Sequence, residues 1–113
     1  MNVTSKALES SDETMTFDHG SVQVVRIGGF VIRSNTFAPG WRWSTSVKPM
    51  AKTDSCNVHH VGYLLSGTLG VASDDGTETE IRAGEAYEIL PGHDGWVVGD
   101  EPVRSVEFTA AEA

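Results

Sequence analysis

The sequence predicts an all-β fold in a single domain. Short segments rich in β-branched and aromatic residues recur from Val22 to Phe108, and glycine or proline turns separate them. No segment keeps the 3.6-residue periodicity of a long helix. The chain has 113 residues, which is enough for one domain. About eight or nine short strands in one domain are typical of a β-sandwich or β-barrel.

The N-terminal segment differs from the rest of the chain. Residues 1–16 are polar and carry little hydrophobic pattern. Within them, Ser10-Ser11-Asp12-Glu13 either caps a short helical turn or belongs to a flexible segment. We therefore expect residues 1–16 to be a polar, flexible N-terminal segment and residues 17–113 to form the single barrel domain.

The strand assignments follow from alternation and from the turns between segments. Gly28-Gly29 permits a tight reversal, and Asp74-Asp75-Gly76 is a strong hairpin signal because glycine adopts a left-handed turn conformation at little cost. Residues 48–55 are expected to form a loop. The expected strands are residues 22–27, 30–37, 41–43, 58–65, 68–72, 77–81, 86–90, 96–98 and 103–108.

Charge and cysteine content exclude several classes of protein. Eight basic and sixteen acidic residues give a net charge of −8, so neither a nucleic acid nor an anionic membrane is an expected partner. The single cysteine, Cys56, excludes an intrachain disulfide. The N-terminus lacks a signal-peptide pattern and no stretch approaches the roughly 20 apolar residues of a membrane helix, so we expect a cytoplasmic protein. Motifs of serine hydrolases, nucleotide-binding proteins and zinc ribbons are absent.

Two phrases in the second half of the chain are the most informative. The first is residues 59–69, HHVGYLLSGTL, and the second is residues 84–96, GEAYEILPGHDGW. Together they resemble the two halves of the cupin signature, and the resemblance to small single-domain cupins of the cupin-2 type covers roughly residues 37–108. It implies a double-stranded β-helix, that is, a jelly-roll barrel, with an internal pocket for a small molecule. It also implies a homodimer.

The glycines match this signature, whereas the metal-ligand positions are non-standard. Aligning the first motif on Gly67 and the second on Gly84 also matches Gly92. The positions that hold metal ligands in the family then fall on Asp54, Cys56, His60 and Gly95.

Strand parity supplies a separate argument for a metal site. Residues two apart share a face of a strand, so an inward Leu64 places His60 and Cys56 inside as well. Gly95 leaves space into which His93 can lean from the preceding turn. We therefore expect His60, His93 and Cys56 to bind a divalent metal, Zn or Fe(II), with Asp54 or Asp94 able to add an oxygen.

Cys56 and the two histidines also have simpler interpretations that involve no metal. A lone cysteine is often a small buried hydrophobe, and a barrel histidine is often hydrogen-bonded core. His59 and Tyr63 are expected to point outward. Asp94 either caps local backbone NH groups or orients His93. Three functions remain open: a metal-dependent enzyme acting on a small molecule, a non-catalytic binding or sensing module, and a purely structural barrel.

Overall fold

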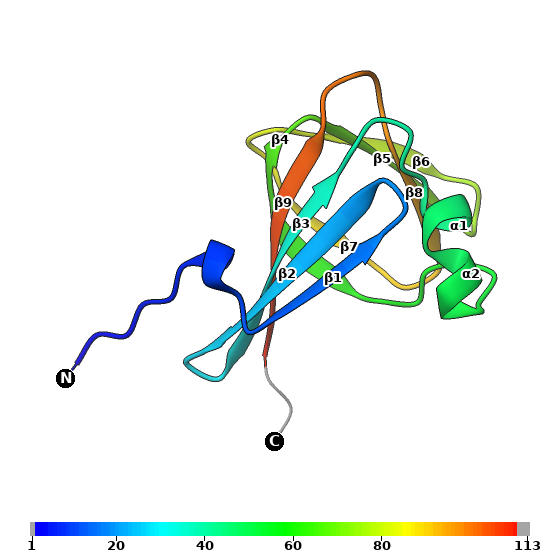
Figure 1. The fold of residues 1–113 in the computed structure, drawn as a ribbon. Helices are drawn as coiled ribbons and strands as arrows, with labels where there is room; N and C mark the ends of the chain where they lie inside the picture. The colour runs from blue at the N-terminus through cyan, green and yellow to red at the C-terminus, as the bar shows by residue number, and fades with distance from the viewer. Residues whose placement is uncertain (1, 111–113) are drawn as a thin grey trace.

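The computed structural model describes residues 2–110 and shows two antiparallel β-sheets packed face to face (Figure 1). The larger sheet has the strand order β1-β2-β3-β9-β4-β7, and the smaller sheet has the order β6-β5-β8. The strands are β1 (Glu13–Phe17), β2 (Gly20–Ile27), β3 (Phe30–Phe37), β4 (His60–Ser66), β5 (Thr68–Ser73), β6 (Glu78–Arg82), β7 (Ala86–Ile89), β8 (His93–Val97) and β9 (Val103–Ala110).

This architecture confirms the predicted all-β jelly roll. Every strand pairing is antiparallel, as expected for strands joined by short turns. Three short helical segments complete the fold: η1 (Leu8–Ser10), α1 (Trp43–Ser46) and α2 (Lys48–Ala51). None of the helices in residues 2–110 is long and apolar enough to cross a membrane.

The core lies between the two sheets and follows the alternation of the strands. Leu64 on β4 and Val103 on β9 are fully buried, while the next residues, Leu65 and Arg104, are exposed. Leu69 and Val71 on β5 face them from the smaller sheet within the same buried cluster. The register of β4 is therefore the predicted one, with Leu64 inside.

The first strand starts earlier than the sequence pattern indicated. β1 begins at Glu13, inside the segment 1–16 that lacked a clear hydrophobic pattern, and pairs with β2 along its length. Its Met15 and Phe17, two residues apart, both line the internal cavity described below. Two apolar residues among threonines are too weak a signal for a strand. The last predicted residues of the domain, 111–113, lie outside the described part of the chain.

The expected strand at residues 41–43 is wrong. Arg42 makes a single β-bridge to Trp96, and Trp43 begins helix α1. Asp94 explains the turn into the helix, because its Oδ1 accepts the Ser44 backbone N–H at 3.0 Å and its Oδ2 lies 3.3 Å from the Arg42 Nε. Residues 48–51 of the expected loop form α2, which lies beside α1 next to β8 (Figure 1).

Candidate functional site

The structure brings Cys56, His60 and His93 together between the two sheets. One ligand atom from each lies within 4.8 Å of the other two. The Cys56 Sγ is 3.6 Å from the His60 Nε2, and the two imidazole rings meet edge to face with centroids 5.1 Å apart. Cys56 and His93 are buried, with 6% and 5% of their surface exposed. No other such cluster of three donors occurs within residues 2–110.

Backbone hydrogen bonds fix Cys56 beside His93. Cys56 lies in the segment before β4, but its N–H donates to the His93 carbonyl at 2.8 Å. Its own carbonyl accepts the N–H of Gly92 at 2.8 Å. His93 is the first residue of β8 rather than part of the preceding turn, so it shares the inward face of that strand with Gly95. The smaller sheet thus supplies one imidazole and positions the thiol.

A carboxylate holds His60 from the other side. The His60 Nδ1 is 2.8 Å from the Glu107 Oε1, and the Tyr87 hydroxyl donates to the Glu107 Oε2 at 2.7 Å. Gly62 makes room for this contact. A Cβ at Gly62 would lie 2.9 Å from the Glu107 Cγ and 2.4 Å from the Val106 carbonyl oxygen. Three adjacent strands, β7, β4 and β9, therefore build one continuous chain of polar side chains.

Both histidines have their Nδ1 atoms occupied. The Nδ1–H of His93 donates to the Leu90 carbonyl oxygen at 2.8 Å, because a carbonyl can only accept. His60 uses Nδ1 toward Glu107. Each neutral ring therefore keeps its lone pair on Nε2. A carbonyl or carboxylate behind the imidazole is the usual arrangement around metal-binding histidines, since it fixes the tautomer and orientation of the ring.

The electrostatics of the site favour a thiolate beside an imidazolium. Burial opposes ionisation of Cys56, but hydrogen bonds from His60 and His93 outweigh it and lower the pKa of the thiol to about 6. Burial likewise opposes the charged form of His60, yet Cys56 and Glu107 raise the pKa of this imidazole to about 9. For Glu107, the bonds from His60 and Tyr87 overcome burial and lower the pKa of the carboxyl.

The three donors line an internal cavity of about 560 Å³. This volume lies within the range of about 300–1,000 Å³ found for small-molecule sites. Its walls are mainly apolar and include Phe37, Trp41, Trp43 and Leu69. Phe37 and Trp41 stack with ring centroids 4.0 Å apart. The arrangement can therefore hold an apolar small molecule against a polar cluster of sulfur, nitrogen and oxygen atoms.

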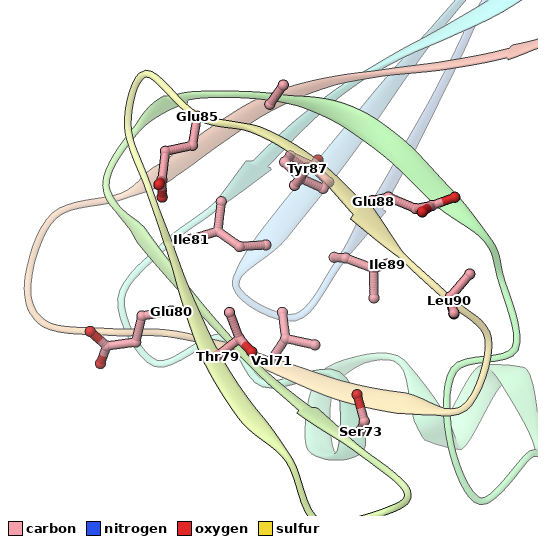
Figure 2. Close-up of a pocket in the computed structure, with 11 residues that line it drawn as sticks. Val71, Ser73, Thr79, Glu80, Ile81, Glu85, Tyr87, Glu88, Ile89 and Leu90 are labelled. Atoms are coloured by element: carbon pink, nitrogen blue, oxygen red, sulfur yellow. The ribbon is translucent and has the colours of Figure 1, made fainter.

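A second, smaller cavity of about 410 Å³ lies along the gap between β6 and β7. Figure 2 shows Val71, Ile81 and Ile89 directed into this space. Glu80 and Glu88 stand at its edges (Figure 2). None of the candidate donor residues lines it, so the chemistry of the molecule is concentrated in the larger cavity.

The other predicted site residues take different roles. Neither aspartate adds an oxygen to the cluster: Asp54 is exposed and lies 3.9 Å from Lys48, and Asp94 caps α1 as described above. Of the two interpretations of Asp94, backbone capping is the one observed, and Leu90 rather than Asp94 orients His93. His59 is exposed beside Glu88, and Tyr63 is exposed on the outer face of β4, both as expected.

Sequence reasoning missed Glu107. Apolar residues occupy both faces of β9, with Val103 on one and Val106 and Phe108 on the other, so alternation does not assign its inward face. In the structure Val103, Ser105 and Glu107 are buried, and Phe108 is exposed. The one signal in the sequence was Gly62. A glycine at an inward position of β4 has no side chain, which leaves space for a side chain from an adjacent strand, here that of Glu107.

Comparison with known proteins identifies the fold. No protein-family model matches the sequence, and no curated protein matches it. A structure of unknown function from Rhizobium leguminosarum has a TM-score of 0.67 and 17% identity, over 99% of this chain and 100% of that one. A cupin-like protein from Thermotoga maritima has a TM-score of 0.58 and 14% identity, over 83% of this chain and 71% of that one. Oxalate decarboxylase from Lactobacillus farciminis has a TM-score of 0.64 and 15% identity, over 89% of this chain and 31% of the enzyme. The chain therefore has the fold of a small single-domain cupin.

Proposed function

We propose that this protein is a metal-dependent enzyme that acts on a small molecule in the larger cavity, with Cys56, His60 and His93 as metal ligands. The observation that carries the proposal is the convergence of these three donors while the Nδ1 atoms of both histidines are occupied. That arrangement leaves the two Nε2 atoms and the thiolate available for a metal ion.

The donor set indicates which ions fit. One thiolate and two imidazoles suit zinc, and Fe(II) also accepts imidazole and thiolate ligands. The low pKa of Cys56 favours the thiolate, which is the metal-binding form of cysteine. Zinc is the first choice because three protein ligands of this kind are typical of its catalytic sites.

The number of ligands supports an enzyme over a structural metal site. Structural zinc sites are usually closed by four protein ligands, whereas catalytic sites keep one position for water or substrate. When bound, such an ion polarises a carbonyl or activates a water molecule. The chain itself supplies the remaining functions: Glu107 orients His60, and the Phe37–Trp41 stack forms an apolar wall. The structural similarity to oxalate decarboxylase shows that this fold can carry an enzyme active site.

Cobalt substitution tests the proposal, because cobalt(II) reports its own ligands by absorption. Metal-free protein titrated with cobalt(II) should develop thiolate-to-cobalt charge transfer and the intense visible bands of a four-coordinate ion. Cys56→Ser should lose the charge-transfer band, and His59→Ala should leave the spectrum unchanged. Absence of any such band in the wild-type protein would contradict metal binding by Cys56.

A second candidate function is catalysis by a cysteine nucleophile, and it follows from the consecutive contacts of Cys56, His60 and Glu107. A thiol 3.6 Å from an imidazole whose other nitrogen is 2.8 Å from a carboxylate is the order found around cysteine nucleophiles. Metal-free protein treated with iodoacetamide distinguishes the two functions. If the metal-dependent function holds, one equivalent of zinc protects Cys56 from alkylation. If zinc gives no protection and alkylation is fast, the thiol function is favoured.

The non-catalytic alternative remains the third outcome. A metal-free barrel whose Cys56 is also unreactive, and which retains an apolar molecule through purification, would be a small-ligand binding or sensing module. Mass spectrometry of the protein under non-denaturing conditions detects such a molecule directly.

A further inference from the structure

Arg33 places a permanent positive charge in the wall of the larger cavity. It lies on β3 with its side chain among the lining residues, and it is half-buried. No other lysine or arginine of residues 2–110 lines this cavity. Because the rest of the wall is mainly apolar, this charge is the strongest recognition element there apart from the donor cluster.

Arg33 has no acidic partner within the described part of the chain, although acidic residues outnumber basic ones by sixteen to eight. Five other cations lie within 4.0 Å of a carboxylate: Lys6, Arg26, Arg42, Lys48 and Arg82. A half-buried arginine without such a partner, facing a cavity, has unused donors for an anionic ligand.

The neighbour best placed to neutralise Arg33 is already engaged. Glu107 stands opposite Arg33 in the β3–β9 register, but its two oxygens contact His60 and Tyr87. The Arg33 Nη1 instead donates to the Thr109 Oγ1 at 3.4 Å, one inward position further along β9. The guanidinium therefore leans away from the donor cluster, so the cavity has a cationic pole and a separate metal-ligating pole.

One part of the cavity wall suits a flat apolar body. Phe37 lies two inward positions from Arg33 on β3, and its ring is nearly parallel to that of Trp41, at 15°. Planar rings that line a cavity offer a large contact area to a planar ligand.

We propose that the cavity binds an organic acid with a planar apolar body, whose carboxylate is held by Arg33. The guanidinium fork matches a carboxylate in geometry and charge. That the opposite end of this molecule reaches the metal ligands rests on the proposed function above. The contact between the carboxylate and Arg33 does not require a metal.

The test uses 3-phenylpropionate and its neutral amide, 3-phenylpropionamide, as a matched pair of probes. Binding to the full chain is measured by calorimetry, first after removal of metal by a chelator and then with zinc added. The wild-type protein should prefer the acid by about tenfold or more in both states, which is the scale of a charge-assisted hydrogen bond. Arg33→Gln should lose this preference while binding the amide as before.

Arg104→Gln is the matched control, because Arg104 lies on β9 with its side chain on the exposed outer face. It removes one positive charge without touching the cavity and should keep the preference for the acid. Arg33→Lys, which retains the charge, should keep part of it even if the Gln variant folds poorly.

Two results would overturn the proposal: equal affinity of the wild type for acid and amide, or an undiminished preference for the acid in Arg33→Gln. Failure to detect binding of the acid at millimolar concentration would also overturn it. If the protein does not bind zinc but still prefers the acid, the proposal for Arg33 stands and the metal-dependent function is wrong, so the two proposals fail separately.

Discussion

At the scale of single residues, Glu107 connects the candidate site to the sheet. It receives His60 on one oxygen and Tyr87 on the other, and only 11% of its side chain is exposed. A buried carboxylate needs such partners, because an unpaired one would be strongly destabilising. Burial and the neighbouring Glu107 charge also raise the pKa of Tyr87, which therefore stays protonated and keeps donating.

Glu107→Gln should weaken zinc binding without unfolding the protein. Glutamine keeps the shape and one oxygen for His60, but it removes the charge that raises the basicity of the ring. Loss of a group behind a metal ligand costs about 10–100-fold in metal affinity. Competition with a zinc chelator measures the effect. Glu88→Gln is the control, because Glu88 pairs with the exposed His59, and equal losses in the two variants would contradict the role of Glu107.

The affinity for zinc should depend on pH up to about pH 9. Metal-binding imidazole must be neutral, and the pKa of His60 in the metal-free protein is raised to about 9. Its protonated form therefore persists above neutral pH, so zinc must displace a proton from His60. Below about pH 6 the Cys56 thiol takes up a proton too. Apparent affinity should rise about tenfold per pH unit from pH 7 to 9. A plateau above pH 7 would contradict this assignment.

At the scale of elements, β4 is the strand that positions the site. It begins at His60 and pairs with both β7 and β9, so it places His60 beside Tyr87 and Glu107. Its inward face reads His60, Gly62, Leu64, and its glycine is required by space rather than by a special backbone angle.

Gly62→Ala should destabilise the protein and disturb the candidate site together. The new Cβ would clash with the Val106 carbonyl oxygen, so the backbone of β9 must shift, and it would crowd the Glu107 side chain at 2.9 Å and the Tyr87 hydroxyl at 3.0 Å. Overpacking of this kind costs about 1–3 kcal/mol. Urea denaturation measures the loss, and the cobalt spectrum reports the site. A variant with wild-type stability and an unchanged spectrum would show that β9 moves aside freely.

Strand parity explains what the sequence could and could not predict about these elements. On β4, the apolar Leu64 indicated which residues point inward. The same alternation correctly predicted that His60, and Cys56 just before the strand, point inward too. On β9, apolar residues occur on both faces, Val103 on the buried one and Phe108 on the exposed one, so alternation could not place Glu107. On β8, the Pro91-Gly92 turn was expected to include His93, whereas the strand begins at that residue. Contacts between strands distant in sequence, such as His60 with Glu107, have no local signal.

At the scale of the whole molecule, strands β4 and β9 carry a group of exposed apolar side chains on the outer face of the larger sheet. Val61, Tyr63 and Leu65 on β4 and Phe108 on β9 are each 41–50% exposed. β4 and β9 are adjacent, and Tyr63 stands opposite Val106. We propose that a second copy of the chain covers this face, because a continuous apolar patch on a small protein is typical of an interaction surface.

Light scattering at micromolar concentration should therefore give the mass of a dimer. Tyr63→Glu should shift the equilibrium to monomer by placing a charge at the centre of the patch. Glu78→Lys, whose side chain is exposed on β6 of the smaller sheet, should leave the dimer intact. A monomeric mass for the wild-type protein would contradict the proposed homodimer.

Elemental analysis of the purified protein tests the metal site formed by Cys56, His60 and His93. We expect about one zinc or iron per chain in the wild type and in His59→Ala, whose side chain lies outside the cluster. His60→Ala and His93→Ala should lose the metal while their circular dichroism spectra stay those of a β protein. If all four proteins contain the same amount of metal, or if the wild type contains none after zinc is supplied, then Cys56, His60 and His93 do not form a metal site.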